Sequence, residues 1–246
     1  MDPRVNIIKK RLENVKRVVA VSGGKGGIGK SVVAATLSLI LKEKDKKIGL
    51  FDADFCGPCA HMILGAKEVY PQEEKGVIPP EVEGIKFMSI NYYSKDNPAP
   101  FREKDISSAF IEMFAITQWG SLDFLVLDMP PGTKDVILDT IRFIPRVEFL
   151  ILTNASQIVL KTVKKTIRLL KEESVSCVGV IENMSRPDFE VKESEITEEG
   201  VKFLGRIRFD DYLEEALGNP SYLLKTKFAL KLNRIITEST DFIGRK

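Results

Sequence analysis

The sequence is poor in cysteine and has no long hydrophobic run. Its 246 residues include three cysteines, one histidine and one tryptophan. Three cysteines are too few for the disulfide framework of a small secreted domain. No stretch approaches the ~20 apolar residues that a membrane-spanning helix needs. The segment 1–17 carries too many charges for a signal peptide, so we expect a cytoplasmic protein.

The charges are nearly balanced. Thirty-seven basic residues face 35 acidic ones, a net charge of +2, and 43% of the residues are hydrophobic. This balance gives no strong indication of a nucleic acid or membrane partner. At about 150 residues per domain the length allows one large domain or two small ones. Because no linker or repeat interrupts the chain, we expect one domain over 1–246, with a surface excursion at about 71–84.

Apolar segments typical of strands alternate with helical segments along the chain. The predicted strands are 17–22, 47–52, 85–90, 122–128, 147–153, 175–182 and 203–209, and the predicted helices are 3–15, 30–43, 103–119, 134–144, 157–172, 210–217 and 226–240. Such alternation is typical of βαβ units, and strands that are apolar throughout indicate helices on both faces. The sequence therefore predicts an α/β fold with a doubly wound, mostly parallel sheet.

A glycine-rich turn between the first strand and the second helix fits the phosphate-binding pattern G-x-x-x-x-G-K-[ST]. Glycines let successive backbone N–H groups turn towards an anion, and the helix that follows adds its positive end. Lys30 is expected to reach the β- and γ-phosphates and Ser31 to ligate Mg²⁺. The predicted nucleotide-binding residues are Gly24, Lys25, Gly26, Gly27, Ile28, Gly29, Lys30, Ser31 and Val32.

Two predicted strands end in aspartate. Asp52 and Asp54 follow one of them, and Asp128 ends another. Ligands of doubly wound folds bind at the carboxyl ends of the strands, and phosphoryl transfer needs acidic groups near the metal and the attacking water. Aspartate at a strand end is also an ordinary helix cap. Two such ends beside a phosphate loop favour a catalytic site.

The segment 22–31, SGGKGGIGKS, resembles the deviant Walker A motif of the MinD/ParA/Mrp class of ATPases. The resemblance implies a P-loop fold that works as a homodimer with ATP between the subunits. In that class the first lysine, here Lys25, crosses the interface to the partner's nucleotide. Lys25 and Lys30 are then both expected to be catalytic.

Two further segments resemble the switch regions of the same class. By this resemblance Asp54 orients the attacking water, and Asp52 and Asp128 hold Mg²⁺ through its waters. The PPGT string at 130–133 is expected to sense the γ-phosphate. The implied activity is slow hydrolysis of ATP to ADP and phosphate.

Longer strings indicate one branch of this class. The segments 52–65, 122–135 and 179–185 resemble the Mrp/ApbC family of iron–sulfur cluster carrier ATPases. The resemblance implies that Asn183 reads the adenine edge, that a [4Fe–4S] cluster bridges two protomers, and that the partners are client apoproteins. Carriers of this family usually place C-x-x-C after the string ENMS, whereas this chain has no cysteine in Ser185–Glu190.

The chain instead carries Cys56 and Cys59 directly after the first switch segment. Four interpretations remain open. They are reduced packing thiols, ligands of a metal or Fe–S cluster shared by two protomers, a redox switch beside the nucleotide, or a Zn²⁺ site with His61. Cys177 lies in a predicted strand and is expected in the core.

Three roles therefore compete for an ATP-dependent switch of this kind. The first is an iron–sulfur cluster carrier. The second is a MinD/ParA-like ATPase that acts on membrane or DNA. The third is a cluster-free, nucleotide-gated binding module.

Overall fold

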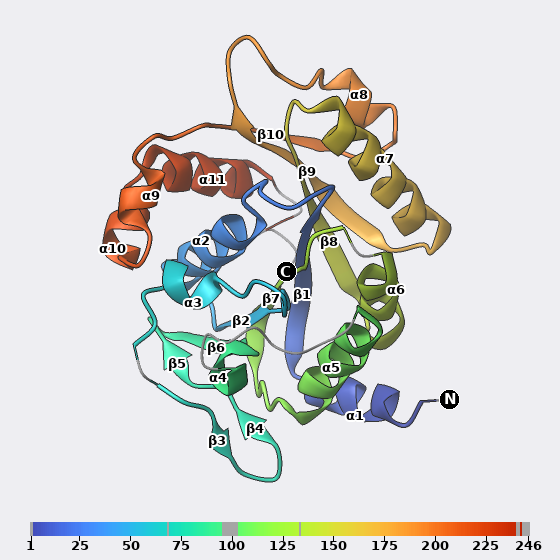
Figure 1. Cartoon of the computed structure of the whole chain (residues 1–246), viewed down its shortest axis with the longest axis vertical. Helices are drawn as coiled ribbons and strands as arrows, with labels where there is room; N and C mark the ends of the chain where they lie inside the picture. The colour runs from blue at the N-terminus through green and yellow to red at the C-terminus, as the bar shows by residue number, and fades with distance from the viewer. Residues whose placement is uncertain (1, 68, 95–102, 133, 240–241, 243–246) are drawn as a thin grey trace.

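The computed structural model describes residues 2–67, 69–94, 103–132, 134–239 and 242. Its centre is an eight-stranded sheet of order β10-β9-β8-β1-β7-β2-β6-β5 (Figure 1). The strands are β1 (Val15–Gly23), β2 (Ile48–Asp52), β5 (Glu81–Val82), β6 (Ile85–Ser89), β7 (Leu122–Asp128), β8 (Val147–Thr153), β9 (Ser176–Ser185) and β10 (Phe203–Arg208). All paired neighbours run parallel except β5, which pairs antiparallel to β6 at one edge.

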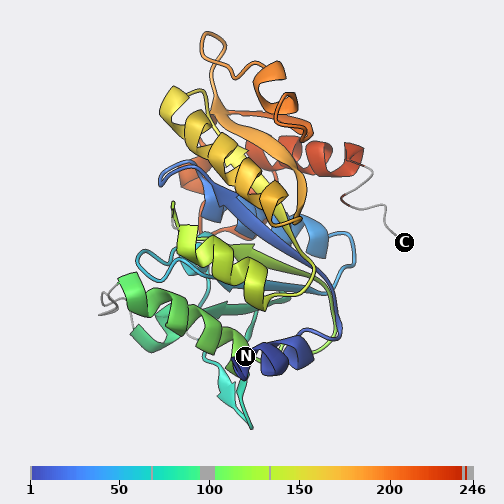
Figure 2. The same cartoon turned by 90° about the vertical axis from the view of Figure 1, so that its right-hand side faces the viewer.

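Helices cover both faces of the sheet, which confirms the predicted doubly wound fold. One face carries α1 (Arg4–Arg11), α5 (Glu103–Ile116), α6 (Lys134–Phe143) and α7 (Gln157–Glu172), which Figure 2 shows in front of the strands. The other face carries α2 (Lys30–Lys42), α3 (Ala60–Ile63) and α11 (Lys227–Glu238) (Figure 1). The shorter helices are α4 (Asn91–Ser94), α8 (Ser194–Thr197), α9 (Leu213–Ala216) and α10 (Pro220–Leu223).

The burial of two helices follows from their sequences. Eight of the 13 residues of α2 are apolar and lie on all sides of the helix, which is buried from Val33 to Leu41 between the sheet and α11. By contrast, α11 is amphipathic and buries Phe228, Leu232, Ile235 and Ile236. The apolar stripe of α11 therefore packs into the core. Among the described residues, no helix is long and apolar enough to cross a bilayer.

The segment 71–84 adds small antiparallel pairings beside the sheet edge. It contains the two-residue strands β3 (Gln72–Glu73) and β4 (Val77–Ile78), which pair with each other, and then β5. Val77 and Val82 are buried, while most of the segment is at least partly exposed.

Strand β9 is longer than the sequence predicted. The sequence predicts a strand that ends at residue 182, but β9 continues to Ser185. Met184 within it has φ of 57°, a left-handed conformation that is unusual for a side chain of this size. The bend lies beside Asn183, whose side chain is therefore set by the strand and not by a loop.

Candidate nucleotide site

The candidate site lies where β1, β2 and β7 end. Val21 of β1 pairs with Asp128 of β7, and Asp128 pairs with Asp52 of β2. The chain leaves β1 through the glycine-rich loop and enters α2 at Lys30. Three neighbouring strands thus bring the loop and two of the predicted carboxylates to one edge of the sheet, where ligands of this fold class bind.

Glycine is required at several points of the loop. Gly27 and Gly29 have φ of 76° and 82°, conformations that L side chains rarely adopt. At Gly24 a Cβ atom would lie 2.6 Å from the carbonyl oxygen of Val159 on α7. Lys25, Gly26 and Gly27 are exposed, so the top of the loop is open to a ligand.

Lys30 is almost enclosed by the loop. It is 6% exposed, and its Nζ donates a hydrogen bond to the carbonyl oxygen of Lys25 at 3.3 Å. Burial lowers the pKa of Lys30, while the carboxylates of Asp128 and Asp54 oppose that shift. An ammonium group with only one weak partner can move to a phosphate without breaking strong contacts.

Asp52 and Asp128 are both fully buried but differ in their partners. Asp52 accepts hydrogen bonds from the backbone N–H groups of Asp54 at 3.2 Å and Ala60 at 3.1 Å. Neither carboxylate oxygen of Asp128 has a hydrogen-bond partner of normal geometry, although the Ser31 hydroxyl lies near enough to lower its pKa. Burial raises the pKa of both aspartates, and their proximity raises that of Asp52 further.

These groups fit a hard divalent cation. A buried carboxylate without a donor needs a positive partner, and Mg²⁺ is usually held by one or two carboxylates together with waters and substrate phosphates. Within the described ranges no group of three or more His, Cys, Asp or Glu side chains could hold a metal by itself. The remaining ligands at Asp52 and Asp128 would therefore be the Ser31 hydroxyl, phosphate oxygens and water.

Asp54 begins the turn that follows β2. Its Oδ1 accepts hydrogen bonds from the backbone N–H groups of Cys56 at 3.3 Å and Gly57 at 3.2 Å. Asp54 is half-buried. Of the PPGT string, Pro131 and Gly132 are exposed, while Thr133 lies outside the described residues.

The three cysteines occupy different environments, and none forms a disulfide. Cys56 is exposed, and Cys59 is half-buried at the start of α3. Burial raises the pKa of Cys59, which the nearby Ser31 hydroxyl partly offsets, so this thiol lies beside the phosphate loop. Burial raises the pKa of Cys177 to about 11, which keeps it a thiol at neutral pH. Half-buried His61 follows on α3.

Asn183 reaches the phosphate loop from β9. The side chain is 3% exposed, and its Nδ2 donates a hydrogen bond to the carbonyl oxygen of Ile28 at 2.9 Å. The sequence resemblance predicted that this amide reads an adenine edge. In the structure the amide nitrogen also contacts the loop backbone, and the adenine contact stays a prediction.

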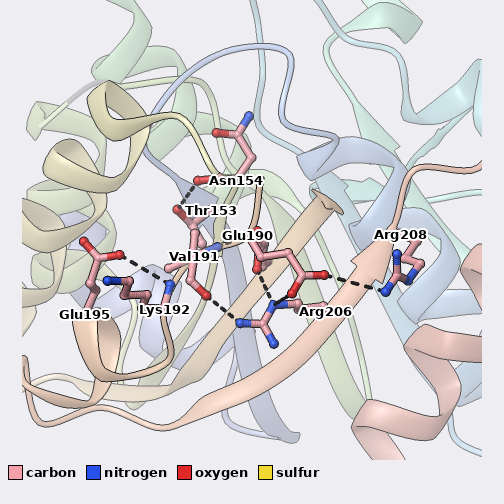
Figure 3. Close-up of polar contacts among 9 residues, drawn as sticks. Thr153, Asn154, Glu190, Val191, Lys192, Glu195, Arg206 and Arg208 are labelled. Atoms are coloured by element: carbon pink, nitrogen blue, oxygen red, sulfur yellow. Dashed lines mark hydrogen bonds and ion pairs between the residues drawn. The ribbon is translucent and has the colours of Figure 1, made fainter. Parts of the chain in front are cut away.

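Next to Asn183, Glu182 belongs to a polar network that the sequence does not predict. Figure 3 shows its other members Arg206, Val191 and Glu190 close together. The Glu182 side chain is 0% exposed and accepts hydrogen bonds from Arg206 Nε at 2.7 Å and from Val191 N–H at 2.9 Å. Arg206 also donates to the Val191 carbonyl oxygen and lies 3.5 Å from Glu190. The sequence signal for this network is Glu182, a charged residue near the end of an apolar strand. Its partner Arg206 cannot be found from that signal, because it lies 24 positions further along the chain.

Comparison with known proteins identifies the family. A family model described as "ParA: NUBPL iron-transfer P-loop NTPase" matches residues 14–238. The chain belongs to this family. This match confirms the P-loop fold and the family resemblance predicted from the motifs.

Curated relatives of this NTPase are named iron–sulfur cluster carrier proteins. The one from Methanocaldococcus jannaschii is 34% identical over 261 residues, covering 97% of this chain and 89% of the relative. The one from Aquifex aeolicus is 38% identical over 181 residues, covering 72% of this chain but 50% of the relative. The match also covers 62% of a carrier protein from Pseudomonas fragi. The chain thus spans about half to three-fifths of these last two relatives.

Solved structures resemble the NTPase over nearly its whole length. A nucleotide-binding protein from Archaeoglobus fulgidus in complex with ADP has a TM-score of 0.73 and 28% identity, covering 90% of this chain and 93% of that one. The septum site-determining protein MinD of Pyrococcus horikoshii, complexed with Mg-ADP, has a TM-score of 0.70 and 20% identity, covering 93% and 97%. The second likeness shows a common fold only.

Proposed function

We propose that this NTPase is a cytoplasmic, Mg²⁺-dependent ATPase built as one domain, and that it works as a homodimer in iron–sulfur cluster transfer. One observation carries the ATPase proposal. A buried carboxylate with no hydrogen bond of normal geometry among the described residues, that of Asp128, lies close to Lys30 and Ser31 of a glycine-rich loop. This combination supplies an anion cradle and a cation ligand side by side.

In the proposed mechanism the residues of this chain bind and orient the triphosphate. The N–H groups of the loop Gly24–Ser31 hold the phosphates, and Lys30 leaves the Lys25 carbonyl to contact the β- and γ-phosphates. Asp54, fixed by its turn, accepts a hydrogen bond from the attacking water and aims that water at the γ-phosphorus. Asp52 and Asp128 would hold Mg²⁺ with Ser31, and the ion would supply charge neutralisation on the β- and γ-phosphates.

The exposed position of Lys25 supports the proposal of a dimer. Its side chain is exposed at the top of the loop while its carbonyl oxygen is fixed by Lys30. An exposed cation beside the phosphates can reach a nucleotide held by a second protomer and offset charge that develops on the transferred group. The ATP-bound dimer would then be the switch state, and hydrolysis would release it.

Two lysine variants test this mechanism. Lys30→Ala is expected to abolish ATP binding in calorimetry, because the loop loses its buried cation. Lys25→Ala is expected to bind ATP but to lose hydrolysis and ATP-dependent dimerisation. A phosphate-release assay measures the hydrolysis, and light scattering measures the dimerisation. Unchanged hydrolysis in the Lys25 variant would exclude the dimer mechanism, and unchanged ATP binding in the Lys30 variant would exclude the assigned site.

We propose that the cargo is an Fe–S cluster held by thiolates of Cys56 and Cys59 from two protomers. Relatives at 34–38% identity are named cluster carriers. The pair lies on the turn between β2 and α3, with Cys56 exposed and Cys59 beside the phosphate loop. Four thiolates are the usual ligand set of a [4Fe–4S] cluster. A cluster here would be directly coupled to the nucleotide.

Anaerobic reconstitution with iron and sulfide tests the cargo. The wild type and a Cys177→Ala control are expected to gain the visible absorbance of a cluster, and the Cys56→Ala/Cys59→Ala variant is not. Equal absorbance in the double variant would refute the assigned ligands. If the wild type gains none, a cluster-free binding module is favoured. ATP-dependent co-sedimentation with liposomes or DNA would instead favour a MinD/ParA-like role.

A further inference from the structure

Asn183 holds one peptide unit of the phosphate loop. Its Nδ2 lies 2.9 Å from the carbonyl oxygen of Ile28, and this bond links positions 155 residues apart in the chain. The contact is enclosed, because Asn183 is 3% and Ile28 2% exposed. A buried amide–carbonyl bond of this kind is costly to leave unmade.

The backbone on both sides of this bond is shaped for the close contact. A Cβ atom on Gly29 would lie 2.5 Å from Asn183 Nδ2, so glycine is needed for the close approach as well as for the φ of 82°. Met184, the next residue of β9, takes a φ of 57°, a conformation that costs free energy in a non-glycine residue. The strand is thus bent at the position that presents Asn183 to the loop.

The bond fixes the direction of a neighbouring donor. In a planar trans peptide the C=O and N–H groups point in opposite directions. The Ile28 carbonyl points to β9, so the N–H of Gly29 points the other way, away from β9. A rotation of this peptide would aim a carbonyl oxygen at the anion, and the glycine at position 29 offers little steric resistance to such a rotation.

We infer that Asn183 is a positioning residue of the nucleotide site: it locks the Ile28–Gly29 peptide so that the Gly29 N–H serves the phosphates. This inference rests on the proposed function, because it assumes that the loop binds a nucleoside triphosphate. It assigns to Asn183 a role in phosphate recognition that does not depend on the base. The population of loops with the correct peptide orientation then sets the apparent affinity.

The test compares ligands with and without the adenine base. Dissociation constants for ATP, GTP and inorganic tripolyphosphate are measured by calorimetry in the wild type, Asn183→Ala, Asn183→Asp and an Asn233→Ala control. Asparagine and aspartate are close in shape, but an aspartate carboxylate cannot donate to the Ile28 carbonyl. Loss of the lock is expected to weaken all three ligands by a common factor of roughly ten, with the control unchanged.

Each outcome decides the inference. A loss confined to ATP would show that Asn183 reads adenine, and wild-type affinity in Asn183→Asp would refute the lock. If both variants fail to fold, amide NMR of the wild type decides. The Gly29 N–H signal is expected to shift on addition of tripolyphosphate while the Asn183 side-chain amide stays protected from exchange; an unshifted Gly29 signal refutes the lock. A wild type that binds none of the ligands would instead contradict the proposed function.

Discussion

The ion pair between Arg206 and Glu182 permits a quantitative prediction. Glu182 is 0% exposed and Arg206 30% exposed, and the two side chains meet at 2.7 Å. In Arg206→Gln the carboxylate of Glu182 keeps the Val191 N–H but loses its charged partner. We expect a loss of free energy of unfolding, with the residues after β9 released from the sheet.

The size of the loss follows from burial. Removing one partner of a fully buried pair costs about 3–5 kcal/mol, and solvent around the partly exposed arginine lowers this to about 2–3 kcal/mol. Arg208 on the same strand is a matched control. It is 65% exposed and lies 3.7 Å from Glu190, so Arg208→Gln should cost about 0.5 kcal/mol or less.

The loss also depends on pH, with a definite sign. Burial raises the pKa of Glu182, and Arg206 opposes the shift, so the variant should have a still higher pKa. When the pKa of a carboxyl group is higher in the folded than in the unfolded state, ionisation of that group destabilises the folded state. The free energy of unfolding therefore falls as the pH rises from the unfolded pKa through the folded pKa. The Arg206→Gln variant should therefore lose more stability at pH 8 than at pH 4, where Glu182 is protonated in both states.

Urea unfolding at both pH values measures these differences as shifts of the midpoint. A double variant, Glu182→Gln/Arg206→Gln, should recover part of the loss at pH 8, because no buried charge is then left unpaired. A loss below about 1 kcal/mol in Arg206→Gln, or an equal loss in Arg208→Gln, would refute the argument from burial.

Three further predictions concern other parts of the chain. Asp128→Asn should raise the thermal midpoint of the nucleotide-free protein, since it removes a fully buried carboxylate that has no hydrogen bond of normal geometry among the described residues, while Mg²⁺-dependent phosphate release is lost; a lower midpoint would contradict this. Gly65→Ala should cost about 3 kcal/mol in urea, because φ is 61° and the new Cβ would lie 2.2 Å from the Gly218 carbonyl oxygen; an unshifted midpoint would count against the described packing. Leu232→Ala, fully buried on α11, should cost about 2–5 kcal/mol by calorimetric unfolding, whereas a dispensable C-terminal helix would tolerate it.

The fold could be predicted from sequence because the central strands are apolar over most of their length. Strands such as β7 and β8 have six of seven residues buried, a pattern that requires cover on both faces. The phosphate loop could be predicted because its glycines and lysine have fixed spacing. Both signals are local patterns of neighbouring residues, which can be recognised in a sequence when the tertiary contacts are unknown.

The partners of β9 could not be predicted in the same way. The bond from Asn183 to Ile28 spans 155 residues, and that from Glu182 to Arg206 spans 24. Neither leaves a periodic pattern in the chain, because each depends on which strands become neighbours in the sheet. The motif predicts an adenine contact for Asn183, but it gives no indication of the hydrogen bond to the Ile28 carbonyl oxygen.

The single tryptophan gives the protein a natural optical reporter. Trp119 is 0% exposed, and its ring centroid lies 6.2 Å from that of Phe51, the residue directly before Asp52. Its indole N–H has no hydrogen-bond partner among the described residues. Indole emission from so dry an environment should lie at short wavelength. Movement at the end of β2, such as binding at Asp52 could cause, can then be followed as a spectral shift without any attached dye.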